Sequence, residues 1–174
     1  MTVTTAVSGP ATIAELPPAT RISLRTADPA AAGAGLGLDL PAGIGARTAA
    51  GLRTALCLGP DEWLVEAPEA EAAELAASLA ALAARLPLSA VDISDREITF
   101  ALEGPAVLDL LATGCPRDLA KLAVGSGART LFDTVQVVLT REAGDRFHLT
   151  VWRSFAPHLR ALLDSALREL AAGL

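Results

Sequence analysis

The stretch EITFALEGP (residues 97–105) and the earlier stretch RISLRTADP (residues 21–29) follow one order of residue types, and this order decides the fold. In each stretch, apolar side chains alternate with their neighbours over a short run, which is typical of a β-strand. Each stretch ends at a proline, and proline is favoured at the first position of a helix. The two stretches therefore predict two strand-to-helix units, offset by 76 residues along the chain.

The later parts of the two halves match as well, with an offset of 84 residues. Leucines recur every three or four residues after residue 68 and again after residue 154, which indicates two amphipathic helices. The sequence therefore predicts an α+β fold of two pseudo-repeated β-α-β-β-α units, with antiparallel sheets covered by helices. The matched positions are Trp63, Leu75, Leu79 and Leu86 with Phe147, Leu159, Leu163 and Leu170.

The predicted organisation has three parts. Residues 1–19 are rich in Thr, Ala and Pro without periodicity, and we expect a flexible N-terminal arm. Residues 20–90 form the first α+β unit and residues 91–174 the second, the two closely packed. Within them we expect a Gly/Pro loop over residues 37–51 and one long or two short strands over residues 129–142.

Two helix ends are also predicted. Gly114 follows a run of leucines, at the place where a helix commonly ends on a left-handed residue. Ser154 precedes the last apolar stripe, and serine is a preferred N-cap residue.

Composition excludes some partners. The net charge is −6, the isoelectric point is near 4.9 and Lys121 is the only lysine, so the chain lacks the basic surface that binds nucleic acid or anionic membranes. No apolar run reaches the ~18 residues of a membrane span. We therefore expect a soluble, cytoplasmic protein.

Several polar residues are candidates for chemistry. Asp92 and Asp95 are close enough in sequence to act as a carboxylate pair, although pairing with an arginine or a turn role is the simpler interpretation. His148 and His158 have no Cys or second His at ligand spacing, so the sequence predicts no metal site. No cofactor-binding motif is complete, and we expect no cofactor in this chain.

The segment TGCPRDL (residues 113–119) contains the most reactive-looking residue, Cys115. A reactive thiol is one hypothesis, since Arg117 lies nearby. The alternative is a structural turn, because Pro116 fixes its own backbone angle and disfavours helix at Cys115. On the structural interpretation, Arg117 and Asp118 are free to face solvent or another chain.

Four segments together carry a resemblance to a known family. They are LCLGPDEWLVEAP (56–68), VDISDREITFALEGPAVLDLLATGCPRDL (91–119), RTLFDTVQVVL (129–139) and DRFHLTVWRSF (145–155). In this order and spacing the chain resembles the gamma subunit of heterotetrameric sarcosine oxidase. That family is similar in turn to the folate-binding aminomethyltransferases of glycine cleavage.

The resemblance implies a function. It implies a non-catalytic, structural subunit of a complex that demethylates sarcosine to glycine, producing hydrogen peroxide and either formaldehyde or methylene-tetrahydrofolate. The implied partners are the alpha, beta and delta subunits, chiefly the large alpha subunit. FAD, FMN, NAD and zinc would belong to these partners, and tetrahydrofolate could bind within the complex.

The resemblance also suggests roles for particular residues. Asp133 is the only acid near the place where the aminomethyltransferases present one to folate, which makes it a weak folate candidate. A stand-alone folate-binding protein is therefore the alternative function, with Asp133, Asp92 or Asp95 as its acid. Interface candidates are Cys115, Arg117, Asp118, Trp152, Arg153 and Phe155.

Overall fold

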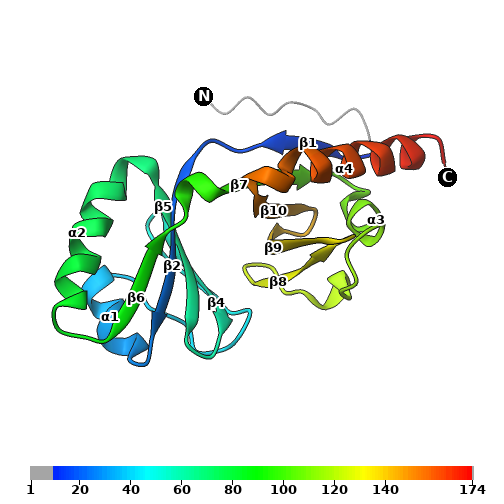
Figure 1. Cartoon of the computed structure of the whole chain (residues 1–174). Helices are drawn as coiled ribbons and strands as arrows, with labels where there is room; N and C mark the ends of the chain where they lie inside the picture. The colour runs from blue at the N-terminus through cyan, green and yellow to red at the C-terminus, as the bar shows by residue number, and fades with distance from the viewer. Residues whose placement is uncertain (1–9, 174) are drawn as a thin grey trace. The chain divides into compact units, whose positions relative to one another are not determined.

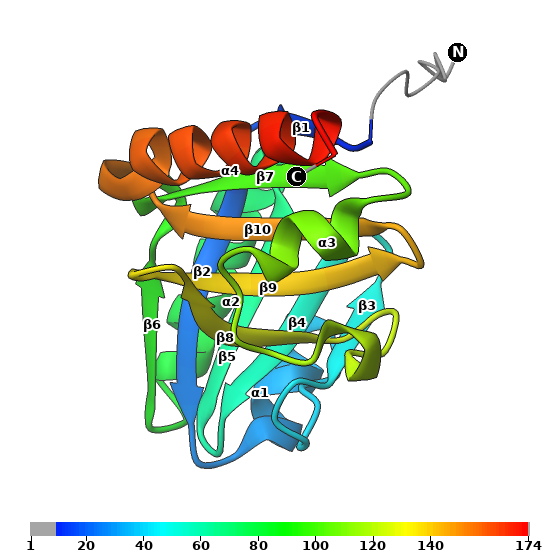
Figure 2. The same cartoon turned by 90° about the vertical axis from the view of Figure 1, so that its right-hand side faces the viewer.

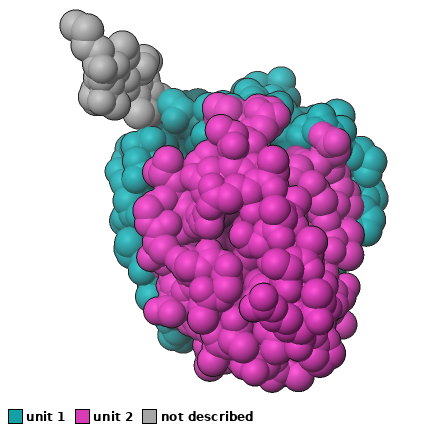
Figure 3. Space-filling view, turned by 90° about the vertical axis from the view of Figure 1, so that its left-hand side faces the viewer, with its two compact units in different colours: residues 1–16, 98–124, 129–174 teal, residues 17–97, 125–128 magenta. Residues whose placement is uncertain are grey.

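The computed structural model describes residues 10–173, which form two compact units (Figure 3). Unit 1 contains residues 10–16, 98–124 and 129–173, and unit 2 contains residues 17–97 and 125–128. Each unit has a five-stranded sheet with helices, so the predicted α+β class is confirmed. No helix among the described residues has the length and apolar composition needed to cross a membrane.

Unit 2 is built on a sheet with the strand order β3-β4-β5-β2-β6, and its neighbouring strands are antiparallel. Helices α1 and α2 lie on one face of this sheet (Figure 1), and Leu24, Val65 and Leu75 are buried between the two layers. Its elements are β2 (Ala19–Thr26), α1 (Pro29–Leu36), β3 (Arg47–Ala50), β4 (Arg53–Gly59), β5 (Glu62–Pro68), η1 (Glu69–Glu71), α2 (Ala72–Ala83), β6 (Leu88–Asp92) and η2 (Ser94–Arg96).

Unit 1 has the strand order β1-β7-β10-β9-β8, with helices α3 and α4 in front of the sheet in Figure 2. Its largest buried side chains include Phe147, Leu110 and Leu159. Its elements are β1 (Thr12–Glu15), β7 (Glu97–Glu103), α3 (Val107–Ala112), η3 (Leu119–Lys121), β8 (Gly127–Phe132), β9 (Val135–Ala143), β10 (Arg146–Trp152), η4 (Arg153–Phe155) and α4 (Ala156–Ala171).

The predicted repeat is present in both units. The chain runs β2-α1-β3-β4-β5-α2 in one and β7-α3-β8-β9-β10-α4 in the other. Trp63 in β5 and Phe147 in β10 are both buried at corresponding places, as are Leu75 in α2 and Leu159 in α4. The two-strand alternative for residues 129–142 is the one present, as β8 and β9. Three strands were not predicted: β1, β6, and β3, which lies inside the expected loop 37–51.

The edge strands differ from the predicted division of the chain. Strand β1 precedes β2 in sequence but pairs with β7, with Ile13 opposite Leu102. Strand β6 precedes β7 but pairs with β2, with Ala90 opposite Leu24. Each sheet therefore takes an edge strand from the segment of chain that leads into the other unit. The predicted division into residues 20–90 and 91–174 differs from these pairings, because it separates β1 from β7 and divides β6 between the two units.

The prediction of a flexible arm over residues 1–19 is wrong for residues 10–19, which the structure describes. Residues 1–9 lie outside the described residues, but β1 is a strand and β2 already begins at Ala19. Gly104 makes the approach of β1 possible, because its φ is 137° and a Cβ there would lie 2.8 Å from the Cα of Ala11. The N–H of Ala106 also donates to the carbonyl of Pro10 at 2.9 Å. These contacts fix the start of the described chain against the β7–α3 turn.

The two predicted helix ends are both wrong. Gly114 is not among the residues with positive φ; its lack of a side chain instead makes room for the ring of Phe132. Ser154 lies within η4, and α4 begins after Phe155 without a side-chain capping bond. The physical reason is that a 3-10 turn separates β10 from α4, so the helix starts one residue later than an N-cap at Ser154 requires.

Replacing Gly114 with Ala tests this contact. A Cβ at position 114 would lie 2.7 Å from Cε1 of Phe132, which is fully buried and cannot move away freely. We expect a loss of about 1 to 3 kcal/mol in unfolding free energy, typical of overpacking. Gly144→Ala is the matched control, since no atom lies within 4 Å of a Cβ there. Equal midpoints in urea denaturation for the two variants would contradict the proposed contact.

Candidate interaction surface

The turn between β10 and α4 presents two exposed aromatic side chains. Trp152 is 44% exposed and Phe155 is 46% exposed, and their ring centroids are 6.4 Å apart. The residues on either side, Val151 and Ala156, are buried in the core of unit 1. The pair is therefore held in place by the core while both rings remain accessible.

This exposure is unusual within the chain. Aromatic residues are only 3% of the sequence, and the remaining four are buried at 2% exposure or less. Trp and Arg are enriched at the centres of protein interfaces, where they contribute most of the binding energy. Arg153, which lies between the two aromatics, is also exposed. The three predicted interface residues Trp152, Arg153 and Phe155 are thus brought together in one turn.

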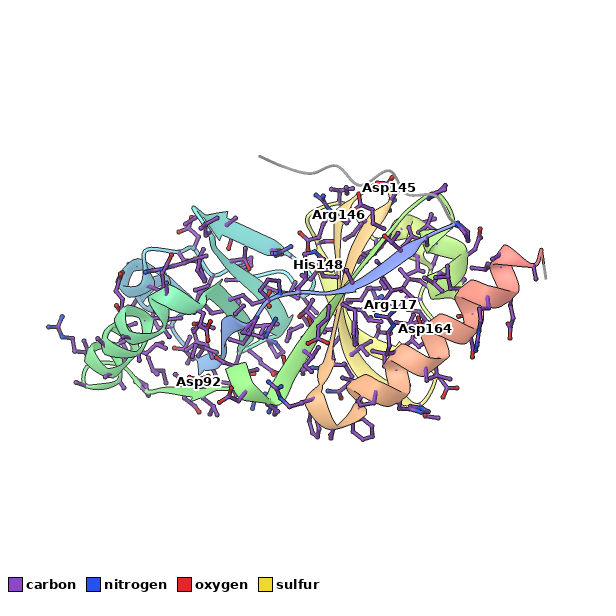
Figure 4. All side chains as sticks on the ribbon, turned by 90° about the horizontal axis from the view of Figure 1, so that it is seen from above. Asp92, Arg117, Asp145, Arg146, His148 and Asp164 are labelled. Carbon is purple, nitrogen blue, oxygen red and sulfur yellow. The ribbon has the colours of Figure 1, made fainter. Side chains whose placement is uncertain are left out.

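The other predicted interface residues are not all on the surface. The Cys115 side chain is 8% exposed and belongs to the core of unit 1, and its N–H donates to the carbonyl of Leu111 at 2.8 Å. Its expected contact with a partner is corrected, because the side chain packs inward. Arg117 and Asp118 are exposed, and Asp118 forms an ion pair with Lys121 at 2.9 Å. Arg117, which is labelled in Figure 4, belongs to unit 1.

Asp133 lies at the tip of the turn between β8 and β9. It has a φ of 52°, the one positive value among the described non-glycine residues, and Asp tolerates this conformation better than most residues. Its N–H donates to the carbonyl of Gly114 at 2.8 Å, and its carboxylate accepts a bond from Thr134 at 3.0 Å. The residue is exposed and has a local structural role in the turn.

The polar candidates for chemistry do not converge. His148 faces Glu142 at 3.5 Å, and His158 is exposed in the first turn of α4. Within the described part of the chain, no three His, Cys, Asp or Glu side chains are grouped as a metal site would require. Both cysteines, Cys57 and Cys115, are unpaired and buried, and burial raises the pKa of the Cys57 thiol.

Asp92 closes the end of β6 and binds the start of η2. Its Oδ1 accepts bonds from the hydroxyl of Ser94 at 2.6 Å and from the N–H of Ser94 at 2.9 Å. These two bonds, the hydroxyl first, lower the pKa of the Asp92 carboxyl, because they stabilise its ionised form. Asp95 is exposed in η2. The bonds of Asp92 to Ser94 form a local turn, as the simpler interpretation of this segment proposed, in place of a carboxylate pair.

The pH dependence of stability should report this turn. Because the pKa of Asp92 is lower when folded, its contribution is present above the unfolded value of about 3.9 and disappears as pH falls through the folded value. We expect Asp92→Asn to flatten the fall in stability below about pH 4. Urea denaturation at a series of pH values measures this, with Asp95→Asn as the control. Identical pH profiles for wild type and Asp92→Asn would refute the role of the Ser94 bonds.

A buried arginine is the main electrostatic feature that sequence analysis missed. Arg21, in β2, is 4% exposed, and its Nε donates to Oε1 of Glu66 at 3.0 Å. One terminal nitrogen also donates to the carbonyl of Glu97 at 3.4 Å. The Glu97 side chain is 8% exposed and bonds Arg96 at 2.9 Å through Oε1. The alternation along RISLRT predicts that Arg21 lies on the face of the strand away from Ile22 and Leu24. Nothing in the neighbouring sequence indicates that both faces of β2 are buried.

Known structures define the class of protein. The chain is similar to the glycine cleavage system aminomethyltransferase T from Bartonella henselae, with a TM-score of 0.72 and 19% identity, over 91% of this chain and 47% of that one. The two units therefore form an α+β protein with the aminomethyltransferase fold. A family model described as the sarcosine oxidase, gamma subunit family matches residues 24–169, and the chain belongs to this family.

Individual relatives agree with the family model. The sarcosine oxidase subunit gamma of Corynebacterium sp. (strain P-1) is 34% identical over 140 residues, 79% of this chain and 68% of the relative. A chain of the heterotetrameric sarcosine oxidase from Corynebacterium sp. U-96 has a TM-score of 0.87 and 29% identity, over 95% of this chain and 88% of that chain. An aminomethyltransferase of Saccharopolyspora erythraea is 36% identical over 62% of this chain, but this covers only 30% of that relative. The resemblance noted from the sequence is confirmed.

Proposed function

We propose that this chain is the gamma subunit of a heterotetrameric sarcosine oxidase and that it contributes binding surface to the complex instead of catalytic groups. The observation that carries this is the exposed Trp152–Phe155 pair, held on a buried strand end in a chain that otherwise buries its aromatic residues. Such a rigid aromatic pair is costly to leave in water and suited to a pocket on another protein.

The partners and cofactors follow from the same proposal. The large alpha subunit is the partner for the Trp152 turn, with the beta and delta subunits in the same assembly. FAD, FMN, NAD and zinc are held by these partners, which carry the oxidation of sarcosine in the cytoplasm. Arg117 and Asp118, exposed on unit 1, belong to the candidate contact surface.

Co-expression with the genes encoding the other subunits tests this function. An affinity tag on this chain should recover a complex with the visible absorbance of flavin and with sarcosine oxidase activity. A soluble chain that is recovered alone, while the other subunits assemble without it, would contradict the proposal.

The aromatic pair gives a sharper test. We expect Trp152→Ala to weaken association with the other subunits at least about tenfold, since truncating a hot-spot aromatic costs about 2 kcal/mol or more. Leu131→Ala is the matched control, because Leu131 is also exposed in unit 1, at 45%. Both variants should keep the wild-type unfolding midpoint, and affinities are compared by titration of the purified remaining subunits. Equal weakening by the two changes would remove the special role of the aromatic pair.

A stand-alone folate-binding protein is the second candidate, favoured by the similarity to aminomethyltransferases. Calorimetry of the isolated chain with tetrahydrofolate decides between the two. Asp133→Asn is the informative variant, since Asn also accepts the positive φ of this turn, so only the charge is removed. Micromolar binding that this change abolishes would establish the second function.

A further inference from the structure

Strand β6 is an edge strand of unit 2 with one side unpaired by any described strand. The N–H of Ile93 donates to the carbonyl of Arg21 at 2.9 Å, so every second residue back from Ile93 bonds β2. The intervening residues Leu88, Ala90 and Asp92 therefore direct their backbone N–H and C=O groups outward. These three residues form a row of backbone donors and acceptors along the open edge.

A groove accompanies this open edge. It has a volume of about 510 Å³ and lies between α2 and β6, which are neighbours in Figure 1. The same three residues line it on the strand side together with Ser89, and Ile22 of β2 also lines it. The helix side is lined mainly by small residues, which leave the space open: Ala72, Ala76, Ala80 and Ala83, together with Leu79.

The edge is weakly protected against pairing with another chain, since Asp92 is the only charged residue of β6. Soluble proteins protect edge strands with Lys, Pro, bulges or a covering element. The sequence of β6, LSAVD, contains neither Lys nor Pro, its register with β2 is regular, and Val91 is 53% exposed. An edge of this kind, beside an apolar groove, has the form of the sites to which extended peptides add as a further strand.

Charge defines the segment that fits. Unit 2 contains eleven Asp and Glu residues against six Arg, whereas unit 1 is nearly balanced, with nine Asp and Glu against seven Arg and one Lys. Asp92 places a carboxylate at one end of the groove, held ionised by its two bonds from Ser94. A segment entering this groove therefore meets apolar walls and a negative charge.

We propose that the β6 edge and the α2–β6 groove bind an extended segment of a partner chain, which adds to the sheet of unit 2 as a further strand. Small apolar side chains of this segment fill the groove, and a Lys or Arg beside them pairs with Asp92. This inference rests on the proposed function, because the partner is another subunit of the oxidase complex. It assigns to unit 2 a contact surface separate in sequence from the Trp152 turn.

Two measurements on the co-expressed complex test the inference. Hydrogen exchange should show the amides of Leu88 and Ala90 protected in the complex and exchanging faster in the isolated chain. Ala76→Glu, which places a charge in the groove, should weaken assembly at least about tenfold. Ala73→Glu is the matched control, an exposed alanine of α2 that does not line the groove, and should assemble as wild type does.

Two further variants examine the backbone and the charge. Ala90→Pro removes an outward N–H without removing a bond to β2, and should weaken assembly while the chain stays folded. Asp92→Asn should weaken assembly about threefold and reduce its dependence on salt.

The outcomes separate this inference from the proposed function. If the wild-type complex assembles, but Ala76→Glu matches Ala73→Glu and the β6 amides stay unprotected, the groove is not a docking site and the gamma-subunit role stands. If the isolated chain is a dimer that Ala90→Pro dissociates, a second copy occupies the edge and the proposed partner is wrong. If no complex forms with the wild-type chain, both proposals fail.

Discussion

Replacing Arg21 with Met is expected to lower the unfolding free energy by about 3 to 5 kcal/mol, the largest expected effect of a single change in this chain. Arg21 is 4% exposed and is the cation for Glu66, whose side chain is 26% exposed. Without it, the Glu66 carboxylate and the carbonyl of Glu97 lose a buried donor. The loss of stability comes mainly from the Glu66 carboxylate and the Glu97 carbonyl, which no longer have the arginine as a donor. Packing changes less, because a methionine side chain fills a similar volume.

Urea denaturation of the full chain measures this effect. Arg25→Met is the matched control on the same strand, because Arg25 is 56% exposed and pairs with Asp61 and Glu62 at 3.5 and 3.6 Å. An exposed pair of this kind contributes about 0 to 1 kcal/mol. If Arg21→Met costs no more than Arg25→Met, the buried pair does not stabilise unit 2 as described.

A double variant separates the charge from the packing. When Glu66→Gln is combined with Arg21→Met, no carboxylate remains at position 66 to lack its cation. We expect this double variant to be less destabilised than the sum of the two single changes, because neighbouring groups in one network do not behave additively. Additive losses would show that the two side chains act independently.

Leu159→Ala is expected to cost about 2 to 5 kcal/mol, the second largest effect. Leu159 is 0% exposed, in the core cluster where α4 covers the sheet of unit 1. Shortening it removes apolar contacts and leaves a cavity, because the close-packed neighbours cannot fully collapse into the space. Thermal and urea denaturation measure the loss.

Leu170→Ala provides the control for this change. Leu170 lies in the same helix and is only partly buried against the same cluster, so helix propensity is matched while burial differs. We expect its cost to be less than half that of Leu159→Ala. Equal costs would mean that α4 does not dock through the face that contains Leu159.

The corresponding position in unit 2, Leu75, is also 0% exposed, and the repeat predicts a similar cost for Leu75→Ala. Hydrogen exchange distinguishes the two variants by location. Loss of protection should concentrate in unit 1 for Leu159→Ala and in unit 2 for Leu75→Ala, since compact units open with some independence.

The pattern of apolar residues predicts the repeat and its main strands and helices, but not the short strands β1, β3 and β6. Leu159 and Leu163 in α4, and Ile22 and Leu24 in β2, mark their helix and strand because periodicity is a local property of the chain. Family membership could likewise be recognised from ordered motifs. The interface candidates Trp152, Arg153 and Phe155 were predicted as residues, and the structure shows that they share one turn with both rings exposed.

Other features depend on which distant segments meet, and no local pattern contains this information. Cys115 and Arg21 were assigned surface or strand roles by their neighbours in sequence, yet both are buried by residues that lie far away along the chain. Gly114 was predicted to cap a helix, whereas Phe132, from another element, accounts for the missing side chain. In each case the deciding contact is long-range.

The sequence by itself determined the α+β class, the two-fold repeat, the inward faces of the helices and the family. Only the tertiary structure decided that β1 pairs in the sheet of unit 1 and β6 in the sheet of unit 2. It also decided that Arg21 is buried beside Glu66, and that an open edge and a groove lie at β6. The physical reason is that alternation and helical periodicity are encoded by near neighbours. Strand partners, burial of charge and grooves are set by packing between segments distant in the chain.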